Sequence, residues 1–196
     1  MTQNILIVNF YIDAFNFYHR IDKYQELYGI CYKWLNYKSL CQSLLLPGQR
    51  LGTIYFFTAV TNSNDHHANM KFRKGSADRH QKYIKALKAY EIKIIQGYFK
   101  YDPKKNRHEE KQTDSNIVAH LLEDAFNNKF DVAFILSADS DIVPAVKVIK
   151  RNKATRNKKI IITPPPFDGR DNKNNPLKIH GISNFVSICD HQRNIH

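Results

Sequence analysis

The sequence predicts an α/β fold with a mainly parallel central sheet. The stretch at 132–136 (VAFIL) is apolar on both faces, which is typical of a central strand that helices cover on either side. Similar apolar runs at 5–12 and 53–60 are separated by segments whose apolar residues recur at helical intervals. Alternation of buried strands with amphipathic helices is the pattern that a parallel sheet requires.

The composition is that of one basic domain. The chain has 196 residues, with 30 Lys and Arg against 18 Asp and Glu, and a formal net charge of +12. Hydrophobic residues make up 42%, with 7 Gly and 7 Pro, which excludes a collagen-like or broadly disordered chain. A protein this basic attracts polyanions. We therefore expect a single domain over residues 1–196 with a polyanionic partner.

Cysteine usage and the first residues indicate a cytoplasmic protein. Cys31, Cys41 and Cys189 show no paired short spacing, so neither a zinc motif nor a disulfide framework is expected. The apolar run from Ile5 is interrupted at Asn9, long before the ~20 residues that a membrane span needs. We expect no membrane association. The oligomeric state stays open, a homo-oligomer included.

The first half of the chain predicts strands that alternate with helices. β-branched and aromatic residues dominate the strand candidates, and Pro47-Gly48 ends the first long helical pattern. The expected elements are a strand at 5–12, a helix at 30–46, a strand at 53–60, a helix at 77–90 and a strand at 92–99. Residues 61–74 are polar, and we expect a connecting segment there.

The second half contains the clearest helix and the most basic run. An apolar stripe follows the helix start at Thr113, and we expect Glu123 and Asp124 to be solvated on that helix. The expected elements are a loop at 100–111, a helix at 113–126, a strand at 132–136, a helix at 142–149, a strand at 160–162, a mobile polar loop at about 164–178 and an edge strand at 182–189. Residues 147–159 carry most of the local positive charge.

Aspartates follow two of the expected strands and open one helix. Asp13 ends the run at 5–12, Asp139 and Asp141 come directly after the run at 132–136, and Asp114 opens the helix that leads into it. The carboxyl ends of parallel strands form the edge where ligands bind, and a helix returning to the opposite edge must begin there. Each aspartate also has a simpler interpretation as a helix cap.

Carboxylates gathered in this way indicate a site for Mg²⁺ or Mn²⁺. Neighbouring carboxylates are costly to keep ionised unless a cation neutralises them, and hard cations prefer oxygen ligands. At a phosphodiester, such ions lower the pKa of a bound water, orient it for in-line attack and stabilise the developing charge. The charge of +12 favours a long polyanion over a small phosphate ester.

Three motifs resemble the NYN domain, a branch of the PIN-like nucleases related to LabA-type proteins. They are IDAFN at 12–16, KQTD at 111–114 and FILSADSDIVPAV at 134–146, and the resemblance runs from Ile5 to about Asp190. It implies a Rossmann-like three-layer α/β/α sandwich (PIN-like) and metal-dependent endoribonuclease activity. It also implies that Asp13, Asp114, Asp139 and Asp141 are the catalytic, metal-binding acids, and that Asn16 and Ser137 hold the substrate or its water. Lys111 is a candidate substrate contact because the segment at 100–111 is basic, and a solvated turn is the equal alternative there.

The chain departs from the family pattern at four positions. Gln112 and Ala138 stand where members typically have Gly, Ile142 where they have Phe, and His120 where they have a further Asp. The first expectation is a ribonuclease that favours single-stranded RNA, because Tyr98 and Tyr101 lie among lysines and could stack bases, although both could equally be core. The alternative is a catalytically weak RNA-binding module. The orientation of His120 relative to the acids discriminates between them.

Overall fold

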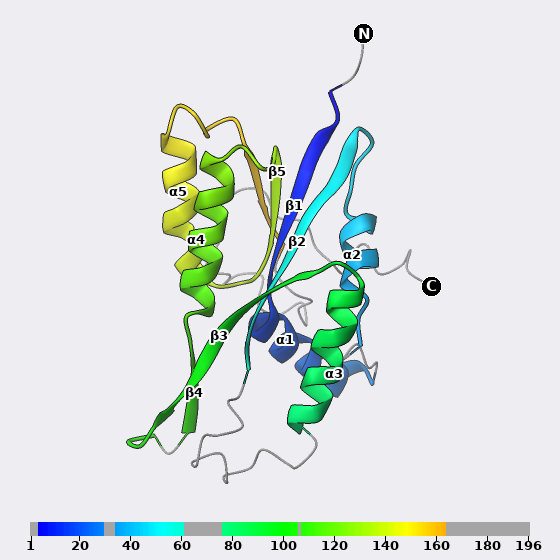
Figure 1. Ribbon diagram of the computed structural model, residues 1–196, viewed down its shortest axis with the longest axis vertical. Helices are drawn as coiled ribbons and strands as arrows, with labels where there is room; N and C mark the ends of the chain where they lie inside the picture. The colour runs from blue at the N-terminus through cyan, green and yellow to red at the C-terminus, as the bar shows by residue number, and fades with distance from the viewer. Residues whose placement is uncertain (1–3, 30–33, 61–75, 106, 164–196) are drawn as a thin grey trace.

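The computed structural model describes residues 4–29, 34–60, 76–105 and 107–163 and shows a mixed α/β fold with one six-stranded sheet (Figure 1). The strands are β1 (Leu6–Asp13), β2 (Gln49–Val60), β3 (Lys93–Asp102), β4 (Arg107–Lys111), β5 (Val132–Leu136) and β6 (Lys159–Ile162), in the order β4-β3-β2-β1-β5-β6. Only the β3–β4 pair is antiparallel. The prediction of a mainly parallel sheet is therefore confirmed.

Helices pack against the sheet through two separate hydrophobic clusters. The helices are α1 (Ala14–Tyr28), α2 (Tyr37–Ser43), α3 (Ser76–Ala89), α4 (Thr113–Phe126) and α5 (Val143–Arg151), with a short 3₁₀ turn η2 (Ser140–Ile142) before α5. Successive side chains of a strand point to opposite faces. Accordingly Phe10 and Ile12 of β1 join the cluster of α1, α2 and α3, whereas Tyr11 joins that of α4 and α5 (Figure 1).

Strands β1 and β5 carry many of the fully buried residues. Every residue of β5 is buried, and Phe10 of β1 stacks on Phe134 of β5 with ring centroids 5.0 Å apart. Complete burial of an aromatic or aliphatic side chain stabilises a fold by roughly 1.5–3 kcal/mol. The apolar character of both strands is thus explained by helices covering both of their faces.

Chain connections diverge at β1. Ile12 pairs with Phe56 of β2 on one side and with Leu136 of β5 on the other. The chain first builds β2, β3 and β4 on one side of β1 and then crosses to β5 and β6. In open α/β sheets the crevice at such a switch point, beyond the carboxyl ends of the strands, is where ligands bind. Here the switch point lies between Asp13 and the residues after Leu136.

Two expectations about the elements are corrected. The segment at 100–111 is not a loop: β3 continues to Asp102, and Arg107–Lys111 returns as the antiparallel edge strand β4. The sequence RHEEK shows no apolar alternation, and strands at the edge of a sheet often carry charged residues. The helix expected at 30–46 is described only as α2 at 37–43. The loop expected at 164–178 and the strand expected at 182–189 lie outside the described residues.

Asp124 is buried, contrary to the expectation that it is solvated. Its Oδ2 accepts hydrogen bonds from the Tyr11 hydroxyl at 2.8 Å and from Asn9 Nδ2 at 3.4 Å, and its Oδ1 lies 3.2 Å from Lys129 Nζ. Burial, followed by the charge of Asp124, raises the pKa of Tyr11 far above its usual value. Asn9 thus interrupts the apolar β1 run because it reaches a buried carboxylate. Glu123, by contrast, is exposed.

None of the described helices is long and apolar enough to cross a lipid bilayer.

Candidate functional site

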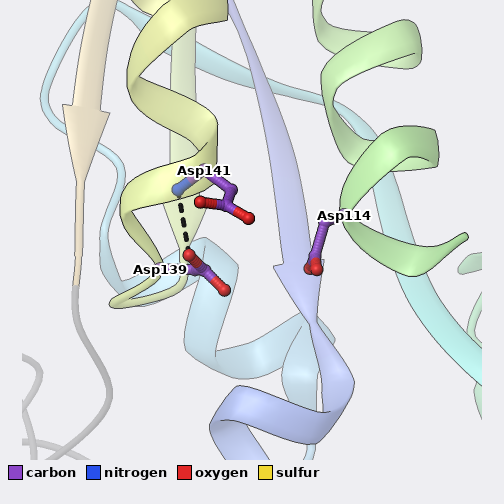
Figure 2. A group of neighbouring side chains, drawn as sticks. All are labelled: Asp114, Asp139 and Asp141. Atoms are coloured by element: carbon purple, nitrogen blue, oxygen red, sulfur yellow. Dashed lines mark hydrogen bonds between the residues drawn. The ribbon is translucent and has the colours of Figure 1, made fainter. Parts of the chain in front are cut away.

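The loop after β5 presents Asp139 and Asp141. Asp139 Oδ1 accepts a hydrogen bond from the Asp141 backbone N–H at 2.9 Å and thereby caps η2 (Figure 2). The simpler cap interpretation is therefore correct for one carboxylate oxygen of Asp139. In the same loop, the Asp141 side chain is exposed. Both residues occupy the predicted position at the carboxyl end of a central strand.

Asp114 approaches the same loop from α4. The residue that caps α4 is Gln112, with no side-chain hydrogen bond, so Asp114 is not the helix cap. One carboxylate oxygen from each of Asp114, Asp139 and Asp141 lies within 4.8 Å of the other two (Figure 2). Residues 25 or more positions apart in the sequence thus meet at one edge of the sheet, as predicted.

The start of α4 depends on a tight backbone approach. Gln112 adopts a left-handed conformation with φ of 76°, a region that favours glycine. On the neighbouring strand, a Cβ added to Gly97 would collide with the Lys111 carbonyl oxygen and lie 3.0 Å from Thr113 Oγ1. The left-handed backbone of Gln112 and the missing side chain of Gly97 allow the chain to turn from β4 into α4 while it lies close to β3. They place Asp114 at the carboxyl edge of the sheet.

Asp13 lies at the end of β1, next to the group of three but outside it. It is 4% exposed, and its Oδ1 accepts the Asn16 backbone N–H at 3.0 Å, which caps α1. Its Oδ2 accepts the Ser137 hydroxyl at 2.9 Å. Asp13 therefore acts as a cap and, through Ser137, contacts the loop that carries Asp139.

Burial and mutual repulsion make ionisation of these acids costly. Burial raises the pKa of Asp13 to about 6, and the nearby charges of Glu110 and Asp139 raise it too. The pKa of Asp114 also rises to about 6, first through burial and then through the charges of Asp13, Asp139 and Asp141. A divalent cation would relieve this repulsion, and a set of carboxylate oxygens suits a hard ion. The residues present therefore fit Mg²⁺ or Mn²⁺.

Two of the three predicted substrate-binding residues form hydrogen bonds with the backbone of the loop after β5. Asn16 Oδ1 accepts the Ala138 backbone N–H at 3.2 Å, and the buried Ser137 hydroxyl accepts the Asp139 backbone N–H at 3.1 Å. These bonds connect the end of β1 with the loop after β5. The third, Lys111, ends β4 three residues before Asp114, and its Nζ lies 3.1 Å from Glu109.

Glu110 is a carboxylate near the site that sequence reasoning missed. Burial raises its pKa, as does the charge of Asp114. Its own charge contributes to the raised pKa of Asp13. The residue lies in the charged strand β4, opposite Phe99, where no apolar pattern or strand end marks it. Only the pairing of β4 with β3 brings it near the aspartates.

His120 belongs to the packing of α4 on the sheet. Its ring centroid lies 5.5 Å from those of Tyr55 and Phe57, in edge-to-face arrangements, and its Nδ1 lies 2.9 Å from the Asn116 carbonyl oxygen. Within the described residues, the group with metal-ligand spacing consists of the three aspartates and does not include His120. The ring thus occupies a structural position.

Comparison with known proteins identifies one family and one named relative. A family model described as NYN domain matches residues 8–170. The chain is also 28% identical over 182 residues to a Pseudomonas putida (strain DSM 28022 / S16) protein named 6-hydroxy-3-succinoylpyridine 3-monooxygenase HspA. That match covers 74% of this chain and 56% of the relative, so the chain spans little more than half of the relative's length. No solved structure matches the chain significantly.

Proposed function

The chain belongs to the NYN domain family, and from this premise we propose that it is a metal-dependent endoribonuclease. The observation that carries the proposal is the meeting of Asp114, Asp139 and Asp141 within 4.8 Å at the switch point of a mainly parallel sheet. The family is nuclease-like, and a carboxylate group at this place suits phosphodiester hydrolysis. We also propose that residues 1–196 form one three-layer α/β/α domain of the PIN-like kind.

The four aspartates have different tasks in this proposal. Asp114, Asp139 and Asp141 hold Mg²⁺ or Mn²⁺, and Asp13 adds charge from its buried position beside them. A bound divalent ion supplies an acidified water and neutralises charge on the phosphoryl oxygens. Attack of such a water on phosphorus would break the bond to the leaving oxygen, which would take up the proton that the water loses, so the chain needs no side-chain nucleophile. The exposed positions of Asp114 and Asp141 leave the group open to a strand of RNA.

Ser137 and Asn16 keep the acids in place. The Ser137 hydroxyl donates to Asp13 and accepts from the Asp139 N–H, and Asn16 accepts from the Ala138 N–H. Fixed acids lower the free-energy cost of reorganisation when the phosphoryl charge develops. We propose that Asn16 and Ser137 affect the substrate and its water indirectly, by holding the acids in position. We also propose that Lys111 contacts a phosphate of the substrate.

Single-stranded RNA is the proposed substrate. The family membership and the net charge of +12 both favour it. Tyr98 is 46% exposed and pairs with Lys111 in the β3–β4 ladder, so an aromatic face and a cation lie together near Asp114. Unstacked bases bind to such aromatic faces, whereas duplex bases cannot reach them.

Two other functions have a specific observation in their favour. A catalytically weak RNA-binding module is favoured by His120, which stands where the family typically has an acid and packs on Tyr55 and Phe57. Oxygenation of a hydroxypyridine is favoured by the name of the 28% identical relative. Dioxygen-dependent consumption of 6-hydroxy-3-succinoylpyridine in the presence of a reductant would support this second alternative.

The proposal is tested by cleavage of labelled single-stranded RNA with Mn²⁺. We expect the wild type to cut the RNA and Asp139→Asn to lose at least 100-fold in rate, on the order of the 2.7 kcal/mol that one electrostatic group contributes. Glu123→Gln, an exposed acid farther along α4, is the matched control and should cut normally. Equal cleavage by wild type and Asp139→Asn would remove the nuclease proposal.

A further inference from the structure

A basic surface lies on α5 and on the turn that follows it. Between residues 142 and 163 the chain contains seven Lys and Arg and no Asp or Glu. Five of the cations are exposed on α5 and on the turn that follows it. We call this set the α5 basic surface, and it consists of Lys147, Lys150, Arg151, Lys153 and Arg156.

The helix that carries the α5 basic surface begins just after the acids. Asp141 lies in η2, and α5 starts at Val143, directly after it (Figure 2). Val143, Ala145, Val146 and Ile149 are buried against the sheet, which leaves Lys147, Val148 and Arg151 on the outer face. A nine-residue helix is about 13 Å long, comparable to about four stacked nucleotides at 3.4 Å each. The cations therefore form a track that leads away from the acid group.

Hydrogen bonds hold the turn after α5 in a fixed shape. Thr155 Oγ1 donates to the Ile149 carbonyl at 2.7 Å, Asn152 Oδ1 accepts the Ala154 N–H at 2.8 Å, and Lys150 Nζ donates to the Lys158 carbonyl at 2.7 Å. A charged run without such bonds is usually a solvated loop. Here the backbone is fixed, so the cations lose less conformational entropy when they bind an anion.

Interaction with the dipole of α5 explains only some of the cations on the α5 basic surface. Lys150 and Arg151 lie in the last turn of α5, where cations interact favourably with the helix dipole. Lys147 lies before that turn, and Lys153 and Arg156 lie beyond the helix. Among the described residues, none of these three forms an ion pair with a carboxylate. Their charge is available to a partner.

From this placement we infer that the α5 basic surface binds the phosphate backbone of the RNA strand on one side of the cut. The inference rests on the proposed function, because it assigns a path to the substrate of that same site. The acids at the cut repel phosphates, so binding requires cations beside them. The first cation of the surface, Lys147, follows Asp141 by six residues on the helix that starts beside the acids. The surface carries no carboxylate of its own and presents exposed Val148 among the cations. A polyanionic strand that reaches Asp141 fits it.

The test compares two triple variants of equal charge. Lys147→Gln, Lys153→Gln and Arg156→Gln together remove three cations from the α5 basic surface without touching the bonds of Lys150. The matched control is the triple variant Lys82→Gln, Lys85→Gln and Lys88→Gln on α3. These lysines are also exposed, but α3 packs in the hydrophobic cluster of α1, α2 and α3 and not in that of α4 and α5. Binding of fluorescein-labelled single-stranded RNA is measured by anisotropy in EDTA, where cleavage does not intervene.

We expect the α5 variant to raise the Kd for the RNA at least tenfold. It should also reduce the slope of log binding constant against log salt concentration by about 2, because each of the three lost phosphate contacts lowers that slope by about 0.7. The control should stay within twofold of the wild type. An α5 variant within twofold of the wild type would overturn the inference. Equal losses in both variants would also overturn it, because net charge alone would then explain binding.

Two further measurements separate this inference from other outcomes. Thermal unfolding of the α5 variant should match that of the wild type, and the single variant Arg156→Gln should show about one third of the change in slope. Loss of binding to phosphatidylserine vesicles with unchanged RNA binding would overturn the inference in favour of a membrane surface. Because the assay is free of divalent ions, an inactive nuclease site would leave its result unchanged, whereas cleavage by the wild type in Mn²⁺ reports on the proposed function separately.

Discussion

Ser137 donates its buried hydroxyl to Asp13 Oδ2 at 2.9 Å, and this bond joins the ends of the neighbouring strands β1 and β5. The register explains it: Ile12 pairs with Leu136, so the residues that follow each of them are neighbours. The same hydroxyl accepts the Asp139 backbone N–H at 3.1 Å. One serine thus links the buried acid Asp13 to the loop that carries Asp139 and Asp141.

Ser137→Ala should weaken both the fold and the site. The variant removes one donor from a buried carboxylate, which costs about 1–3 kcal/mol in the free energy of unfolding. Because this hydrogen bond lowers the pKa of Asp13, its loss should raise that pKa further. Chemical denaturation at pH 7 and the pH dependence of RNA cleavage measure the two effects. Ser140→Ala, in the same loop, is the control, and equal behaviour of the two variants would argue against the link.

The stability of the metal-free protein should fall as the pH rises from about 4 to about 6. Unfolded Asp13 loses its proton near 3.8, whereas the folded protein retains it until about 6, so ionisation of Asp13 favours unfolding over this range. A difference of about 2 pKa units corresponds to about 3 kcal/mol. Urea denaturation in EDTA at several pH values measures it.

Asp13→Asn provides the comparison for that profile. The amide cannot ionise, so its stability curve should be flatter than that of the wild type between pH 4 and 6. RNA cleavage by the wild type should rise through pH 6, because the acids bind a cation only when ionised. Parallel stability profiles for the wild type and Asp13→Asn would show that Asp13 has an ordinary pKa in the folded protein.

The parts of this fold that follow from local pattern were predictable. The strands at 132–136 and 53–60 are apolar on both faces because helices cover them, and that pattern is visible in the residues themselves. The positions of Asp13, Asp139 and Asp141 were predictable because each lies at or just beyond the carboxyl end of an apolar run. Asp114 was predictable because its helix leads into the next strand of a parallel sheet.

The parts that depend on distant partners were not predictable. The polar strand β4 is defined by its pairing with β3, and Glu110 comes near the aspartates only through that pairing. Asp124 has the same local pattern as exposed Glu123, and it is buried because Asn9 and Tyr11 of β1 reach it. Neither Glu110 nor Asp124 has a residue pattern in its own neighbourhood that indicates these contacts.

Gln112→Gly should stabilise the protein. A non-glycine residue with a backbone φ of 76° destabilises the folded state by roughly 1–2 kcal/mol. Glycine avoids this strain, but it also increases the conformational entropy of the unfolded chain, which offsets part of the gain in stability. The expected net gain is about 0.5–1 kcal/mol in urea denaturation. Gln112→Ala keeps the strained conformation and should show no gain. A loss of stability in the glycine variant would mean that the Gln112 side chain makes a compensating contact.

His120→Ala should lower stability without weakening metal binding. The ring has edge-to-face contacts with Tyr55 and Phe57, and such contacts contribute about 0.5–1.5 kcal/mol each beyond burial. Mn²⁺ affinity, measured by calorimetry, should stay within threefold of the wild type. A tenfold loss would show instead that the imidazole takes the place of the family's acid as a ligand.

The most direct test of the central claim is a Mn²⁺ titration followed by electron paramagnetic resonance. The claim is that Asp114 of α4 and Asp139 of the loop after β5 share one divalent cation. Asp114→Asn and Asp139→Asn should each raise the Kd for Mn²⁺ at least tenfold, while Glu123→Gln should leave it unchanged. Wild-type affinity in both aspartate variants would contradict the claim.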